Sequence, residues 1–219
     1  MTSAPTSVPS ADPSSAPTST IPTAPPSLSG WVATVTASTI TTSKLDADTL
    51  QNYAASIAES YGVGAADVST SVTYSASGTM SIAIPEGSTQ EQLTEAIKAS
   101  LSESLGIHPQ NVEVKVDMLS GEVTFTISSN DFNAVQSAKF DLENEVILRE
   151  ITSKIESEIP ESKVTNVSVS PDTRATVEFI VDADNAKNDL TQAAWQTENL
   201  LSDFDVEIKS KFLFAYNFC

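Results

Sequence analysis

The chain of 219 residues has almost none of the residue types on which disulfide and metal chemistry depend. Its only cysteine is Cys219, the last residue, and its only histidine is His108. A single cysteine excludes a disulfide within the chain, so the fold has to rest on its hydrophobic core. One histidine far from one cysteine cannot supply a Ser-His-Asp triad, a Cys-His pair or a structural zinc site. We therefore expect no enzyme activity, no cofactor and no bound metal, and interpret His108 as an exposed turn residue.

Basic side chains are also scarce. Lysine and arginine number 11 against 29 aspartates and glutamates, which gives a formal net charge of -18 and an isoelectric point near 4.1. Such a negative field repels phosphate backbones and anionic lipid surfaces. No segment approaches the roughly 18 consecutive apolar residues of a membrane-spanning helix, and residues 1–5 have neither the basic start nor the apolar stretch of a secretion signal. We expect no nucleic-acid partner, no direct membrane insertion and no signal peptide in the chain as given.

Glycine is rare as well, and its 7 residues are scattered singly, which excludes a glycine-rich phosphate-binding loop. The acidic segment of residues 182–189 begins like a calcium loop. It departs from that motif at its fifth, sixth and twelfth positions, where an alanine, a lysine and an alanine replace the required oxygen ligand, glycine and glutamate. We expect Asp184 or Asn185 to cap the following helix instead.

Four carboxylates in the middle of the chain could in principle form an acid–base pair for catalysis. They are Asp141, Glu143, Glu145 and Glu150. Helical spacing places Arg149 and Lys154 within pairing distance of them. We therefore interpret these carboxylates as a solvated helix face rather than as catalytic residues.

What the chain does contain is a proline-rich beginning. Of the first 30 residues, 20 are serine, threonine or proline, and 7 of the 11 prolines lie there. Four of them recur at every fourth position: Pro5, Pro9, Pro13 and Pro17. Proline fixes φ and lacks a backbone donor, and the segment holds too little apolar surface to offset the entropy of ordering. We predict a disordered or extended arm over residues 1–30, acting either as a strap across a neighbouring subunit or as a flexible spacer.

The composition changes at Trp31, where a first series of helices and strands begins. Its predicted elements are a strand at 31–40, a helix at 50–61, a hairpin of strands 68–75 and 79–84, a helix at 93–105 and a strand at 112–116. Aspartate caps are expected for the first helix and a capping box for the second, with Gly62 and Gly106 ending them. The first hairpin is expected to turn at Ser77-Gly78.

The same order of elements then begins again. Its predicted elements are a strand at 122–128, a helix over 132–159, a hairpin of strands 164–170 and 173–181, a helix at 190–200 and a final strand at 204–218. The second hairpin is expected to turn at Pro171-Asp172. Two β-α-β-β-α-β series thus follow the arm, one over residues 31–119 and one over 120–219. Ser120-Gly121 is short enough for a hairpin turn that would join both halves in one sheet, and this alternative stays open.

This element order resembles the ferredoxin-like fold in two copies, and together with a Ser/Thr/Pro stalk it resembles SEA-type extracellular modules. The resemblance implies an α+β fold of two tandem ferredoxin-like modules with antiparallel sheets. SEA modules often carry a self-cleaving turn with a serine after a glycine. Here Ser77-Gly78-Thr79 and Ser120-Gly121-Glu122 lack that serine, so self-cleavage is not implied. The repeated Ser-Ala-Pro-Thr-Ser arm is similar to those of surface proteins of marine algae and of their large viruses.

The final strand has an apolar, largely aromatic face. Every second residue from Phe204 to Phe218 except Ser210 is apolar or aromatic, which makes a longer ribbon than most strands of small domains. An exposed edge of this kind would aggregate, so we expect it to be covered by the body, by the arm, or by a neighbouring chain that adds a strand. An ordinary edge strand within the chain is the other interpretation.

These features predict a non-enzymatic structural protein of a surface layer, fibre or virion shell, placed at an extracellular surface or in a virion. Its partners would be other protein subunits, including copies of itself. The predicted partner-binding residues are Pro5, Pro9, Pro13, Pro17, Trp31, Phe212, Phe214, Tyr216 and Phe218. The alternative is a stalked extracellular adhesion module that binds glycan or protein through its sheet face or its loops.

Overall fold

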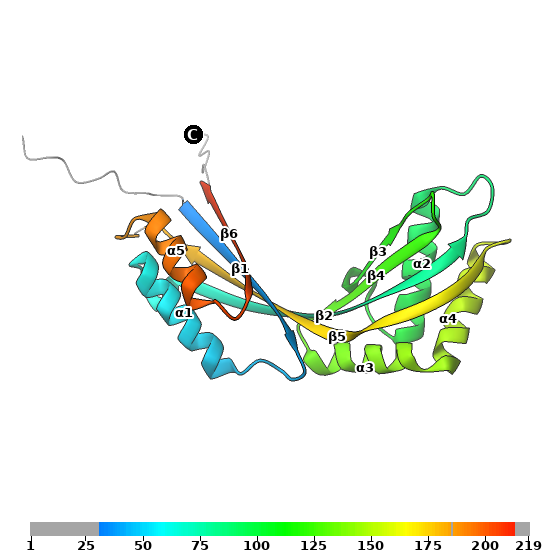
Figure 1. Cartoon of the computed structure of the whole chain (residues 1–219), viewed down its shortest axis with the longest axis horizontal. Helices are drawn as coiled ribbons and strands as arrows, with labels where there is room; N and C mark the ends of the chain where they lie inside the picture. The colour runs from blue at the N-terminus through cyan, green and yellow to red at the C-terminus, as the bar shows by residue number, and fades with distance from the viewer. Residues whose placement is uncertain (1–30, 185, 213–219) are drawn as a thin grey trace, which may run out of the picture.

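The computed structural model describes residues 31–184 and 186–212, which form an α+β body with one antiparallel sheet (Figure 1). The strands are β1 (Trp31–Thr41), β2 (Val68–Ala83), β3 (Val112–Val116), β4 (Glu122–Ser129), β5 (Lys163–Asp182) and β6 (Asp205–Phe212). The helices are α1 (Ala47–Tyr61), α2 (Gln90–Leu105), α3 (Phe132–Glu143), α4 (Glu145–Glu158) and α5 (Leu190–Leu200), with short 3-10 turns η1 (Ala65–Asp67) and η2 (Pro109–Asn111). The predicted arm, residues 1–30, and residues 213–219 lie outside the described residues.

The sheet has the strand order β3-β4-β2-β5-β1-β6. All six strands therefore belong to one sheet, and two tandem modules with separate sheets are not confirmed. The turn at Ser120-Gly121 joins β3 to β4, where Val116 pairs with Val123. The alternative that this turn links the two halves in one sheet is confirmed. The predicted boundary between residues 119 and 120 falls within this turn, between two strands that are hydrogen-bonded neighbours.

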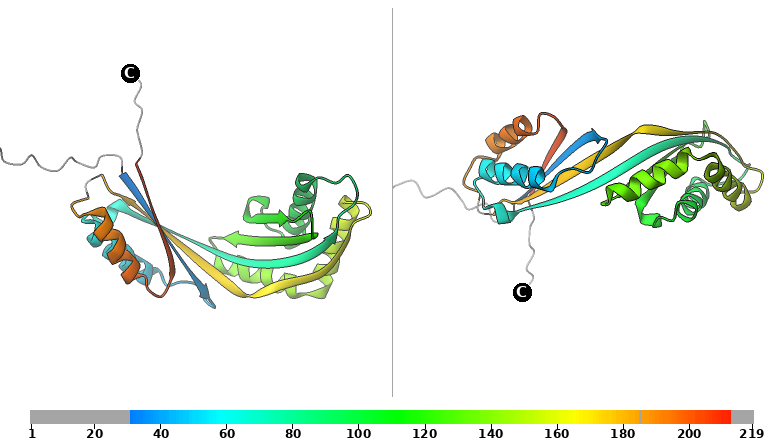
Figure 2. Two further views of the ribbon diagram at one scale, coloured as in Figure 1. Left: turned by 45° about the horizontal axis from the view of Figure 1, so that its top comes forward. Right: turned by 90° about the horizontal axis from the view of Figure 1, so that it is seen from below.

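Both hairpins predicted around Ser77-Gly78 and Pro171-Asp172 are wrong, because each is part of one long strand. The 16 residues of β2 pass through both halves of the molecule beside the 20 residues of β5. Figure 2 shows the two strands running side by side along the body and twisting as they go. Gly78 is needed for close packing against Phe125 rather than for a turn, since a Cβ atom on Gly78 would lie 2.3 Å from the Cζ atom of that ring.

Irregular pairing, rather than a turn, accommodates Pro171-Asp172. Ala76 pairs with Thr173, and two residues later Gly78 pairs with Val169, so β5 holds two more residues than β2 across this interval. A second irregularity follows between Thr79 and Ser81. Proline is tolerated in a strand at such a bulge. It has no backbone N–H donor, and the bulged position needs none for the regular hydrogen-bond ladder. The turn-forming residues of β5 thus bend the strand without reversing it.

The elements form two circuits, one nested inside the other. The outer circuit runs β1-α1-β2 and then β5-α5-β6, and its strands lie in the order β2-β5-β1-β6. The inner circuit runs β2-α2-β3-β4-α3-α4-β5, and its strands lie in the order β3-β4-β2-β5. We call these the outer half and the inner half. The two halves share β2 and β5. One part of each strand pairs within the outer half, and the other part pairs within the inner half.

All five described helices cover the same face of the sheet. Along β1 the odd positions 33, 35 and 37 are buried, and along β2 the buried positions are even. The pairing register places these positions on one face of the sheet. In Figure 1 the body is V-shaped, with α1 and α5 on one arm and α2, α3 and α4 on the other. The opposite face of the sheet carries no helix of the described chain, and we call it the open face.

Separate apolar cores stabilise the two halves, and a small cluster joins them. The core of the outer half includes Ile57, Tyr61 and Phe179, while that of the inner half includes Leu93 and Ile97. The joining cluster consists of Tyr74, Ala76, Val135 and Ala175. The Tyr74 hydroxyl accepts a hydrogen bond of 2.9 Å from the backbone nitrogen of Leu45, and its ring meets Phe132 edge-on at 5.3 Å. This cluster fixes the point at which the sheet passes from one half to the other.

The predicted helix ends are confirmed for the first two helices. Asp46 accepts a hydrogen bond from the Thr49 amide at the start of α1, and Gly62 ends that helix with a φ of 67°. Thr89 and Gln92 form the capping box of α2, and Gly106 ends it with a φ of 63°. Glycine reaches this left-handed conformation without the steric cost that a Cβ atom imposes.

The single helix predicted over residues 132–159 is wrong. Asn144 adopts an extended conformation between α3 and α4, and its side chain accepts a hydrogen bond from the Val146 amide. Asn144 is therefore both the C-cap of α3 and the N-cap of α4. Asparagine suits the N-cap because its side-chain oxygen accepts from a backbone amide that has no partner within the helix. The break lets α3 and α4 follow different directions over the inner half (Figure 1).

Candidate functional site

The two ends of the described chain lie side by side. Trp31, the first residue of β1, is the Cα pairing partner of Phe212, the last residue of β6. The residues before position 31 and after position 212 therefore leave the body at the same end of the same strand pair. The predicted partner-binding residues Trp31 and Phe212 are brought together, whereas the four arm prolines and Phe214, Tyr216 and Phe218 lie outside the described residues.

His108 occupies an exposed turn, as predicted. It precedes η2, and its Nδ1 atom accepts a hydrogen bond of 3.2 Å from the backbone nitrogen of Gln110. Asn111 in turn donates its amide to the His108 carbonyl at 2.8 Å. Both contacts are local, and they stabilise the short turn that leads into β3.

The acidic segment before α5 has a structural role. Asp189 caps α5 and accepts hydrogen bonds from the amides of Thr191 and Gln192, so the prediction that Asp184 or Asn185 caps this helix is wrong. The side chain of Asn188 donates to the carbonyls of Glu59 and Ser60, at 3.2 Å and 2.9 Å. These carbonyls belong to the last turn of α1, where regular helical donors run out, although Glu59 also accepts from the Gly62 amide. The segment thus connects α5 to the end of α1.

Of the four carboxylates considered, Glu145 and Glu150 are exposed beside basic residues of α4, as predicted, while Glu143 is exposed and Asp141 is half-buried. Glu145 pairs with Arg149 at 3.3 Å, and Glu150 pairs with Lys154 at 3.0 Å, each at helical i,i+4 spacing. Lys154 also reaches Glu103 of α2 at 3.5 Å, which the sequence pattern did not indicate. The hydrogen bond with Glu150 is the main cause that raises the pKa of Lys154. The Lys154–Glu103 pair connects α4 to α2 at the surface.

The other resolved pKa changes also have local structural causes. The Thr49 backbone hydrogen bond lowers the pKa of Asp46, and the Leu119 backbone hydrogen bond lowers that of Asp117 in the β3–β4 turn. Burial raises the pKa of Tyr61, with a further contribution from the charge of Glu198. Within residues 31–184 and 186–212, no three histidine, cysteine, aspartate or glutamate side chains are grouped so as to hold a metal ion.

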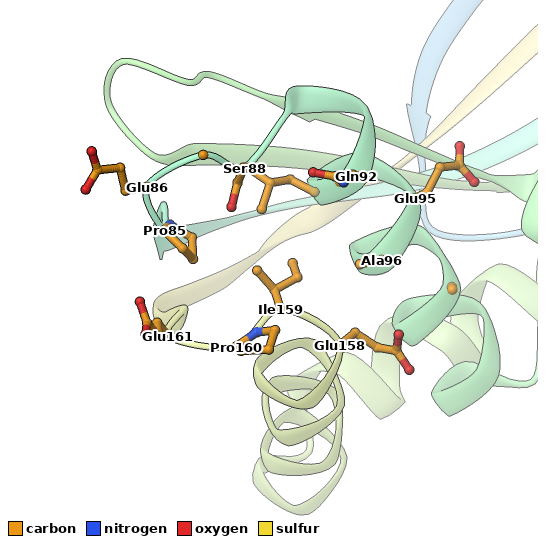
Figure 3. A pocket seen from close by; sticks show the side chains of 13 residues that line it. Pro85, Glu86, Ser88, Gln92, Glu95, Ala96, Glu158, Ile159, Pro160 and Glu161 are labelled. Carbon is orange, nitrogen blue, oxygen red and sulfur yellow. The ribbon is translucent and has the colours of Figure 1, made fainter.

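One hollow lies at the far end of the inner half, between the start of α2 and the end of α4. It measures about 720 Å³, and Leu93, Ala96 and Ile159 line it together with four glutamates. Figure 3 shows these carboxylates, Glu86, Glu95, Glu158 and Glu161, directed outward and away from one another. The hollow is therefore an open groove whose acidic groups do not converge on one point.

The open face of the sheet is covered with hydroxyl groups. All seven outward positions of β2 from 69 to 81 are serine or threonine: Ser69, Ser71, Thr73, Ser75, Ser77, Thr79 and Ser81. Where the sheet bends, a hollow of about 410 Å³ is lined by the hydroxyl residues Ser77, Thr79, Thr124, Thr126, Ser168 and Ser170. Sequence reasoning missed this surface, although the alternation of hydroxyl and apolar residues in β2 and β4 was the signal for it.

Another hollow, of about 410 Å³, is lined mostly by apolar residues, together with Gln51 and Thr70, and lies beside the edge of the sheet in the outer half. It is bounded by α1 on one side and by β2 on the other. The residues that line it include Ala47, Leu50, Ala54, Ala55, Val68 and Val72. We call it the α1–β2 groove. The predicted helix contained Leu50, Ala54 and Ala55, and the predicted strand contained Val68 and Val72, but only the fold brings them together around one groove.

No protein-family model, curated protein or solved structure matches this chain. The resemblance to SEA-type modules and to surface proteins of algae and their viruses therefore stays a prediction. Among the helices of residues 31–212 that the structure describes, none has the length and apolar character needed to cross a membrane.

Proposed function

We propose that this protein is a non-enzymatic building block of a surface layer, fibre or virion shell, and that it holds its neighbours through the chain segments flanking the body. The observation that carries the proposal is the pairing of Trp31 with Phe212. Because of this pairing, the proline-rich arm and the aromatic C-terminal segment leave the body from one place. Two flanking segments that leave from one end can bind a single neighbouring subunit together, because binding of one segment raises the effective concentration of the other at its own site.

The shape of the sheet supports the same proposal. β2 and β5 each pair on both sides along only part of their length, so each half has stretches of strand edge with no partner strand among the described residues. Strand edges expose backbone donors and acceptors that another chain can use. A body of shared strands is also suited to bearing load, since β2 and β5 connect its two ends without a flexible linker.

We further propose that both circuits are ferredoxin-like modules, the inner one inserted into the outer one between its second and third strands. The outer circuit has the β-α-β-β-α-β order, and the inner circuit has the same order with its second helical segment divided into α3 and α4. The strands of each circuit are antiparallel, with helices on one face. The setting that we propose, an extracellular surface or a virion, fits the formal net charge of -18, which keeps a protein soluble at high concentration.

The proposal is tested by measuring the mass of the protein in solution. The full chain is compared with a variant lacking residues 1–29, a variant lacking residues 213–219 and a variant lacking both, over a wide range of concentration and with a reductant present. We expect the full chain to associate and the double deletion to be monomeric. A full chain that stays monomeric at high concentration would contradict self-assembly, and an assembly unaffected by both deletions would contradict the role of the flanking segments.

The second candidate function is a stalked adhesion module that binds a neutral glycan on the open face. The hollow lined by Ser77, Thr79, Thr124, Thr126, Ser168 and Ser170 favours it, because hydroxyl groups both donate and accept hydrogen bonds, as sugar hydroxyls do. Titration with neutral oligosaccharides tests it, using Thr79→Val and Thr124→Val to remove hydroxyls while keeping shape. Thr49→Val, on the opposite face, is the matched control. Binding that is equally strong in all variants would exclude this surface.

A further inference from the structure

In the outer half, one edge of the sheet is formed by a stretch of β2 with no partner on its outer side. β4 pairs with β2 only between Tyr74 and Ser81. The preceding residues, Val68–Thr73, pair with β5 and with no other strand of the described chain. A strand edge of this length presents a row of backbone donors and acceptors that an added strand can satisfy.

The α1–β2 groove lies directly beside this edge. Its lining is mostly apolar, with Gln51 and Thr70 as its polar residues, and contains no charged residue; its α1 side is formed mainly by Ala47, Ala54 and Ala55. Small side chains at these positions leave the volume of about 410 Å³ that larger residues would fill. Ala55 is exposed, and Leu50 and Val72 are half-buried, so apolar surface remains in contact with solvent. An added strand could bury its large side chains here while its backbone pairs with β2.

The C-terminal segment of this chain, residues 213–219, has the chemistry that such a site requires. Its sequence is Leu-Phe-Ala-Tyr-Asn-Phe-Cys, without proline, glycine or charge. In a strand, alternate residues point to the same side, so Phe214, Tyr216 and Phe218 would share one face. Large aromatic residues on the segment complement the small residues of the groove. The proline-rich arm fits less well, because each proline removes a backbone donor from an added strand.

The segment cannot reach this edge within its own chain. It begins after Phe212, at the end of β6, and the order β2-β5-β1-β6 places three strand spacings between that point and the edge. Three spacings amount to about 14 Å, and seven extended residues span at most about 25 Å. Crossing the end of the sheet would use about four residues and leave about three, too few to cover Val68–Thr73. The segment of a second copy has no such restriction.

We propose that the C-terminal segment of one copy adds as a strand to Val68–Thr73 of a second copy and places its aromatic face in the α1–β2 groove. This inference rests on the proposed function, since it assigns the acceptor surface for one of the two flanking segments. The edge begins near the level at which the donor segment leaves the body, because Val68 and Ser210 are both aligned, through Val181 and Ala33, in one row across the sheet.

The test compares four proteins by sedimentation velocity, all with a reductant present so that Cys219 forms no disulfide. They are the full chain, the chain lacking residues 213–219, Ala55→Trp and Ala66→Trp. Ala55→Trp fills the groove from an exposed helix position, whereas Ala66→Trp adds the same side chain at an exposed position outside the groove. We expect the deletion and Ala55→Trp to weaken association at least about tenfold, and Ala66→Trp to associate like the full chain.

Hydrogen exchange provides a second measurement that does not depend on a substitution. The amides of Val68–Thr73 are expected to be protected in the associated full chain and to exchange faster in the deletion variant. If the deletion is monomeric but Ala55→Trp associates normally and exchange at Val68–Thr73 is unchanged, assembly through the segment stands and the proposed acceptor is wrong. If the full chain never associates, or associates equally well without residues 213–219, the contribution of this segment to the proposed function is wrong and this inference fails with it.

Discussion

The ring of Phe125 lies against the backbone of Gly78, its pairing partner on the neighbouring strand. A Cβ atom on Gly78 would lie 2.3 Å from Phe125 Cζ and 2.7 Å from the carbonyl oxygen of Ser168. The absence of a side chain at position 78 therefore makes room for a ring that is fully buried in the core of the inner half. The same residue keeps β2 continuous at the point where its sequence suggested a turn.

Replacing Gly78 should destabilise the protein. We expect Gly78→Ala to lower the free energy of unfolding by about 1–3 kcal/mol, because the added methyl group has to displace the ring or the backbone of β5. Denaturant unfolding measures the effect, and Ser77→Ala, at the adjacent exposed position, is the control. In a Phe125→Leu background Gly78→Ala should lower the free energy of unfolding by less, because the smaller leucine side chain leaves room for the added methyl group. Equal losses in both backgrounds would show that the ring is not the cause.

The two halves should unfold together. Both tryptophans and all tyrosines of the described chain lie outside the inner circuit's own segment, residues 84–162, so tryptophan fluorescence reports on the outer half and far-ultraviolet circular dichroism on both. Because β2 and β5 belong to both halves, we expect the two signals to give coincident unfolding curves. Ile97→Val, in the inner core, should lower the fluorescence midpoint as well, with a loss of about 0.5–1.5 kcal/mol. An unchanged fluorescence midpoint in Ile97→Val would mean that the halves unfold independently.

Removing the side chain of Asn188 should loosen the end of α1. Its amide donates to the carbonyls of Glu59 and Ser60, so Asn188→Ala leaves both without this partner. We expect a loss of stability of about 1 kcal/mol and faster exchange of the last amides of α1. Lys187→Ala, which shortens the preceding exposed residue but keeps its Cβ atom, is the matched control. Unchanged exchange in Asn188→Ala would indicate that these two hydrogen bonds do not hold the helix end.

The cap of α1 should contribute to stability in a pH-dependent way. The backbone and side-chain hydrogen bonds from Thr49 lower the pKa of Asp46 below its ordinary value of 3.8. The folded state therefore favours the ionised carboxylate, and its contribution is complete above the ordinary value and lost as the pH falls through the lowered pKa. Asp46→Asn keeps a capping acceptor without a charge. Unfolding midpoints measured from about pH 6 to about pH 2 should fall less steeply in Asp46→Asn than in the unmodified chain, and parallel curves would contradict this.

Local features of the fold could be predicted because their causes lie close together in the sequence. Asp46 and Thr49, or Thr89 and Gln92, are three residues apart, and the contact that starts each helix needs nothing from the rest of the chain. The strand at Trp31–Thr41 and the turn at Ser120-Gly121 follow from residue types and spacing in the same way. The exposed position of His108 also follows from its place between a helix end and a proline.

Long-range packing decided the features that prediction missed. Gly78 and Pro171 have the local signature of turns, but each lies within a strand because Phe125 and the irregular pairing of β5 accommodate it. Asn144 has the signature of a helix surface residue, yet it ends α3 because α4 packs against α2 in a different direction. In each case the energy of a contact with residues far away in the sequence exceeds the local preference.

The sequence by itself determined the order of the helical and most strand segments, the alternation of hydroxyl and apolar residues in β2, and the aromatic alternation of residues 212–218. Only the tertiary structure decided that the two circuits are nested, that Trp31 meets Phe212, and that Val68–Thr73 form an edge beside an apolar groove. The physical reason is that periodicity sets which face of an element is buried, whereas strand pairing depends on which distant strand supplies the complementary backbone and side chains.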